Sequence, residues 1–126
     1  MLGGMHLVKA ARAAVAACAV LLSLSACANA ESAKPEEKVF PFSGTTLDVA
    51  AHETPTDLVA TDREDVKVTL WFDVKGTNAT SHSSLKNGRL DLNAGCSGLA
   101  FCDAKFRVEV PRGVKVLRDG RETDLR

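Results

Sequence analysis

Apolar and polar residues alternate with a period of two along most of the chain after Val39. Each alternating run places apolar side chains on one face and polar side chains on the other, as half-buried β-strands do. No segment after Val39 has sustained helical periodicity. The pattern therefore predicts an all-β domain over residues 39–126, with strands in the runs 47–51, 58–61, 66–74, 90–94, 106–110 and 114–116.

Turn-forming residues fall between these runs. Asn87-Gly88 is a strong signal for a two-residue hairpin, and Asp119-Gly120 resembles it. Pro111-Arg112-Gly113 predicts a tight turn between two strands. The segment between Gly76 and Gly88 lacks apolar alternation, so we expect a polar loop there.

The first 26 residues follow a different pattern. Lys9 and Arg12 precede an uncharged, mostly apolar run over residues 13–26. This run is shorter than the roughly 20 apolar residues that a membrane-spanning helix needs. A charged start followed by a short apolar run is typical of an export signal.

The export signal ends in Leu24-Ser25-Ala26-Cys27, which resembles the lipobox of bacterial lipoproteins. The resemblance implies that Leu24, Ser25 and Ala26 are read by a signal peptidase that cuts before Cys27. It also implies that Cys27 carries lipid, which would anchor the chain to the extracytoplasmic face of the cell membrane. The alternative is an ordinary secretory signal that is cut after Ala30.

Residues 27–38 follow the proposed cut and are small, polar or charged. They have no apolar periodicity, so we expect a flexible, lipidated tether rather than part of the fold. An extended segment of this length reaches up to about 35 Å from the bilayer.

Charge and aromatic content narrow the classes of partner. The chain has 16 basic and 16 acidic residues, and Lys9 and Arg12 leave with the leader. The exported part therefore has a weakly negative net charge, and we predict no nucleic-acid partner. Trp71 is the single tryptophan and tyrosine is absent, so we do not expect an aromatic-lined groove.

Cys96 and Cys102 remain after the leader is removed. An extracytoplasmic compartment favours pairing, so we predict a disulfide that contributes about 2 kcal/mol through the closed loop. A zinc site with His52 and His82 is one alternative, although the spacing fits no common zinc pattern. A redox-active pair is the other alternative.

The stretch 45–116 resembles an adhesin-like family of unknown function found in bacterial lipoproteins. Its most specific part is a strand ending in Gly95-Cys96, then Cys102, a second strand and the turn at residues 110–114. The resemblance implies a β-solenoid-like or layered, largely antiparallel fold without catalytic residues. Family members continue with further strand–turn units, so we expect this chain to leave an exposed sheet edge after Leu117 that favours self-association.

These features favour a non-enzymatic, membrane-anchored lipoprotein that acts as an adhesin-like or envelope interaction domain. The alternative is a small ligand- or metal-binding lipoprotein associated with a transporter. An enzyme lacks support, because Ser81-His82-Ser83-Ser84 is no triad by itself and the acidic turn at residues 62–65 lacks the order of a calcium loop. We therefore predict no catalytic residue, bound metal or cofactor.

Overall fold

The computed structural model describes residues 28–97 and 101–125 of the chain. The leader, the recognition residues Leu24, Ser25 and Ala26, and the proposed lipidation site Cys27 lie outside these ranges. Within them the chain forms a short 3-10 helix and nine strands, which are η1 (Ala30–Ser32), β2 (Pro35–Phe40), β3 (Thr46–Ala50), β4 (Thr56–Thr61), β5 (Val66–Lys75), β6 (Ala79–Lys86), β7 (Arg89–Cys96), β8 (Phe101–Pro111), β9 (Lys115–Arg118) and β10 (Arg121–Glu122).

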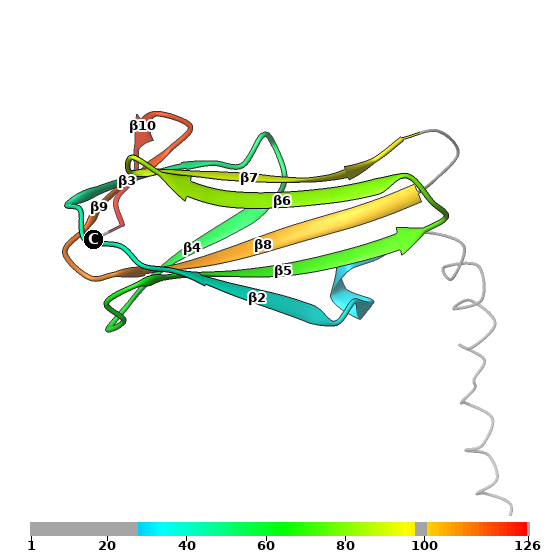
Figure 1. Cartoon of the computed structure of the whole chain (residues 1–126), viewed down its shortest axis with the longest axis horizontal. Helices are drawn as coiled ribbons and strands as arrows, with labels where there is room; N and C mark the ends of the chain where they lie inside the picture. Colours follow the sequence, from blue (N-terminus) through cyan, green and yellow to red (C-terminus); the bar gives the residue numbers. More distant parts are fainter. Residues whose placement is uncertain (1–27, 98–100, 126) are drawn as a thin grey trace, which may run out of the picture.

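The strands form two sheets that stack face to face (Figure 1). One sheet has the order β2-β5-β8-β4, and the other has the order β10-β9-β3-β7-β6. The predicted all-β class is confirmed. A solenoid is wrong, because strands distant in the sequence pair with each other and the chain passes repeatedly from one sheet to the other.

Both sheets are mixed, so the prediction of a largely antiparallel arrangement also needs correction. Strand β3 pairs in parallel with both β7 and β9, and β4 pairs in parallel with β8. The central pair β5–β8 is antiparallel, as are the hairpins β6–β7 and β9–β10. Alternation in a sequence identifies the buried face of a strand, but it does not identify the strand's neighbours.

The apolar faces of the two sheets meet in one core. Its buried members come from β3, β5, β7, β8 and β9 and from the residue just before β9, and they occupy the alternating positions expected from the sequence. They are Leu47, Val49, Val66, Val68, Leu70, Leu90, Leu92, Phe106, Val108, Val110, Val114 and Val116.

The predicted hairpin turns are present. Asn87 and Gly88 both have positive φ, at 53° and 78°, and join β6 to β7. Asp119 and Gly120 repeat this geometry between β9 and β10, with φ of 51° and 81°. Two consecutive residues at positive φ are the mark of the type I′ turn, whose twist matches that of paired strands.

Two segments that we expected to be irregular are strands. Residues 76–88 contain β6, which pairs along its whole length with β7. The expected tether contains β2, which pairs with β5, and η1, in which Ala30 is buried. The prediction that residues 28–38 are a flexible tether is therefore wrong for the part that η1 and β2 occupy.

In the part of the chain that the structure describes, β9 is not itself an open edge, and the sheet ends instead in the exposed two-residue strand β10. Strand β9 pairs with β3 on one side and with β10 on the other. After β10, the backbone N–H and the hydroxyl of Thr123 both donate to the carbonyl of Val116, at 3.2 and 2.8 Å. Self-association through another edge stays a prediction.

The predicted disulfide is confirmed. Cys96 ends β7 in one sheet, Cys102 lies near the start of β8 in the other, and their Cα atoms are 6.2 Å apart. The bond therefore joins the two layers where the chain crosses between them.

Replacing Cys96 and Cys102 together by serine is expected to lower the free energy of unfolding by about 2 kcal/mol, because the unfolded chain regains the entropy of the closed loop. Urea denaturation of the oxidised protein and the double variant measures the difference. Reduction of the unchanged protein is the control and should produce a similar loss. An unchanged midpoint in both cases would contradict a structural role for the bond.

Candidate functional site: a slot between two edge strands

One side of the sandwich is open between the two sheets. Strands β2 and β6 are edge strands of opposite sheets, and a cavity of about 510 Å³ lies between them. The opposite side is closed, because the chain passes directly from β3 to β4 and the guanidinium of Arg118 donates to the carbonyl of Thr56 at 3.0 Å. We call the open side the edge slot.

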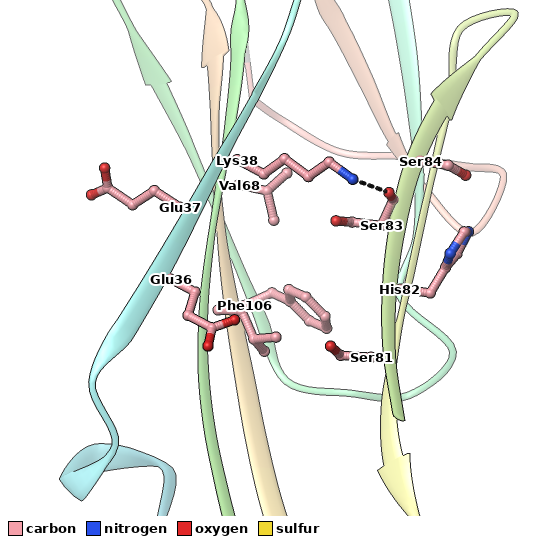
Figure 2. A pocket seen from close by; sticks show the side chains of 10 residues that line it. Glu36, Glu37, Lys38, Val68, Ser81, His82, Ser83, Ser84 and Phe106 are labelled. Atoms are coloured by element: carbon pink, nitrogen blue, oxygen red, sulfur yellow. Dashed lines mark hydrogen bonds between the residues drawn. The ribbon is translucent and has the colours of Figure 1, made fainter. Parts of the chain in front are cut away.

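Strand β2 turns two charged side chains into the edge slot. Glu36 and Lys38 are the register partners of Leu70 and Val68, which face the core, so they share the inward face. The Lys38 ammonium crosses the slot and donates to the backbone carbonyl of Ser83 at 3.2 Å (Figure 2). Glu37 points away from the slot, and its carboxylate lies 3.0 Å from the Lys67 ammonium.

Strand β6 contributes hydroxyl groups from the other side. Ser81 and Ser83 are opposite Ala94 and Leu92 on the inward face of the β6–β7 hairpin, and both face the slot in Figure 2. His82 and Ser84 lie along the same wall, but their side chains point away from it.

The floor of the slot is part of the hydrophobic core. It is formed by Val68, Leu70 and Phe106, and Phe106 is only 1% exposed. The slot is therefore a cleft with polar walls and an apolar base. The residues of the base are closely packed in the core and expose little of their surface to the slot.

The arrangement can bind a polar, extended group. It offers a carboxylate, an ammonium group and two hydroxyls, and each wall has an edge whose backbone N–H and C=O groups have no neighbouring strand among the described residues. Charges that point inward from an edge strand also discourage uncontrolled strand addition. A ligand must therefore match Glu36 and Lys38 rather than only supply a strand.

The residues that the sequence raised as other candidates are separated or already paired. His52 lies against Asp91, with Nε2 and Oδ1 2.5 Å apart, on the outer face of the five-stranded sheet. In the acidic turn, Asp65 pairs with Arg63 and Asp62 pairs with Arg112. The disulfide occupies both thiols that a zinc site would need.

Neither a metal-binding cluster nor a membrane-spanning helix is present within residues 28–97 and 101–125. No cluster of three or more His, Cys, Asp or Glu side chains in these ranges is arranged to hold a metal ion. No helix in the same ranges has the length and apolar character needed to cross a membrane.

Sequence reasoning missed the edge slot. Its signal was present in the alternation of Ser81 and Ser83 with outward residues, but only Ala79 and Leu85 at the two ends of the inward face of β6 are apolar. The same holds for Glu36 and Lys38 in β2. A strand whose inward face is polar along most of its length resembles a loop when only hydrophobic periodicity is used.

Comparison of the chain with protein-family models, with curated proteins and with solved structures gave no match. The resemblance to the adhesin-like family therefore stays a prediction.

Proposed function

We propose that the chain is a bacterial lipoprotein, anchored through Cys27 to the extracytoplasmic face of the membrane, whose β-sandwich acts by binding rather than by catalysis. The observation that carries the binding role is the edge slot, where Glu36, Lys38, Ser81 and Ser83 converge between two unpaired strand edges. Its ligand is an extended polypeptide segment of an envelope protein, because such a segment can use both the strand edges and the charged side chains.

A small polar molecule is the second candidate ligand, and it corresponds to a capture protein that works with a transporter. The slot volume of about 510 Å³ favours it, because small-molecule sites typically have about 300–1,000 Å³. The charged pair from β2 would then orient the molecule.

A photo-crosslinking amino acid placed at Ser81 is expected to capture the ligand in cells that carry the anchored full chain. The matched control places the same group at His82, one residue along β6, where the side chain points away from the slot. We expect crosslinked products from position 81 and few or none from position 82. A product removed by protease identifies a polypeptide, whereas a small mass increase on the intact chain identifies the second candidate.

Lys38→Met removes the ammonium group and keeps most of the side-chain stem. A hydrogen bond to a charged group is worth about 1.5–3 kcal/mol, so we expect roughly ten- to hundredfold weaker binding and a matching loss of crosslinks from position 81. Lys86→Met, on the outer face of β6, is the control. Equal crosslinking from positions 81 and 82, or an unchanged yield in Lys38→Met, would contradict binding in the edge slot.

A further inference from the structure

The segment that follows Cys27 is fixed to the outer face of the four-stranded sheet. The backbone N–H of Asn29 donates to Asp73 Oδ2 at 2.7 Å, and the N–H of Ala30 donates to Asp103 Oδ2 at 2.8 Å. Ala30 is 5% exposed, so its side chain is packed as closely as many core residues. We call residues 28–32 the docked segment.

The two acceptors are a matched pair. Asp73 on β5 and Asp103 on β8 are register partners, so two carboxylates stand directly opposite each other. Like charges in this position destabilise a sheet unless something compensates for them. Here each carboxylate accepts a backbone N–H from the docked segment, and the Lys75 ammonium lies 3.7 Å from Asp73.

This contact limits how far the lipid can stand from the sandwich. Only two peptide units, each about 3.8 Å between Cα atoms, join Asn29 to the proposed lipidation site, so the lipid is attached at most about 8 Å of chain from Asn29. A lipid on Cys27 is therefore joined by a short length of chain to the point where Asn29 and Ala30 contact Asp73 and Asp103, rather than by a long tether.

The same end of the sandwich has an exposed aromatic side chain. Phe101, at the start of β8, is 65% exposed and is the register partner of Lys75, the last residue of β5. It lies two residues before Asp103, so both side chains project from the same face of the strand. Figure 1 places the start of β8 and the end of β5 together at the end where η1 lies.

We propose that this end of the sandwich rests on the phospholipid bilayer, with Phe101 entering the interface and Lys75 facing the headgroups. The proposal rests on the lipidation of Cys27 proposed above. Aromatic rings favour the level of the headgroups, and lysine keeps its ammonium in water while its stem lies along apolar surface. The docked segment sets the orientation, because it fixes the chain two residues after the anchor to Asp73 and Asp103.

An introduced tryptophan tests the orientation. The lipid-modified full chain carrying Trp71→Phe and Phe101→Trp is placed in vesicles of phosphatidylcholine and phosphatidylglycerol, with brominated or ordinary acyl chains. The matched control carries Trp71→Phe and Glu64→Trp in the turn before β5, at the opposite end of that strand. We expect bromine to lower the emission from position 101 by at least about twofold, because interfacial groups lie roughly 5–10 Å into the headgroup boundary. Emission from position 64 should be unchanged.

The docked segment is tested through the natural tryptophan. Trp71 lines a small cavity with Ala30 and Glu31, so release of the segment uncovers it. Asp73→Ala with Asp103→Ala should raise quenching of Trp71 by acrylamide in the otherwise unchanged chain. The same pair of changes should reduce bromine quenching at position 101. Asp62→Ala, at the opposite end, should do neither.

The outcomes distinguish a failure of the proposed orientation from a failure of the proposed lipid anchor. A chain that does not float with the vesicles would overturn the anchor and this orientation together, before any quenching is measured. A chain that floats, with emission from position 101 insensitive to bromine or with equal quenching at positions 64 and 101, would overturn the orientation alone. Strong quenching at position 101, weak quenching at position 64 and relief by the double aspartate change would establish the orientation.

Discussion

Phe106→Ala is expected to lower the free energy of unfolding by about 3–5 kcal/mol, the usual cost of removing a buried phenylalanine. Phe106 is 1% exposed and lies at the base of the edge slot, so the change removes core contacts and leaves a hole that opens toward the slot. A small domain is stabilised by only about 5–15 kcal/mol in total. The variant should therefore lie close to the limit of folding.

Phe101→Ala is the matched control, because it removes the same side chain from the same strand at a position that is 65% exposed. Its expected effect is within about 0.5 kcal/mol. Urea denaturation followed by the emission of Trp71 measures both. Similar losses in the two variants would mean that Phe106 is not the centre of the core. A loss in Phe101→Ala alone would mean that the packing of β8 is inverted.

The different burial of Phe106 and Phe101 also shows why only some of the strands could be predicted from the sequence. Strands with one face in the core, such as β5 and β8, have the alternation that burial imposes. Strands β2 and β6 lack most of it, because only Phe40 and Leu85 at one end of these strands pack against the core, while most other inward positions face the edge slot. Glu36, Lys38, Ser81 and Ser83 are polar for that reason, and hydrophobic periodicity could not find either strand.

The pairing of strands that are far apart along the chain could not be predicted from the sequence either. The parallel partners β3 and β7 are separated by three other strands along the chain, and no local pattern identifies them. The docked segment is a further case. It is held by two carboxylates that are distant in the sequence, so its own composition suggested a tether. The disulfide could be predicted, because the sequence has two cysteines a short loop apart and the expected extracytoplasmic location favours their pairing.

The structure also bears on where the leader is cut. A cut after Ala30 would remove Asn29 and Ala30, whose backbone amides satisfy Asp73 and Asp103. The two carboxylates would then face each other without those donors. A cut before Cys27 keeps both residues. A chain cut before Cys27, as proposed, would therefore keep both donors of the docked segment.

Cys27→Ser is expected to abolish the mature, membrane-bound form of the protein, because a serine hydroxyl cannot form the thioether that carries the lipid. The protein should accumulate as an unprocessed precursor or be released from the membrane fraction. Fractionation of cells and intact mass of the recovered protein measure the result. Cys18→Ser is the matched control, because Cys18 lies in the apolar part of the leader, and it should leave lipidation unchanged. A mature product that begins at Glu31 in the unchanged chain would support the secretory alternative. A lipid-modified, membrane-bound product from Cys27→Ser would show that the anchor lies elsewhere.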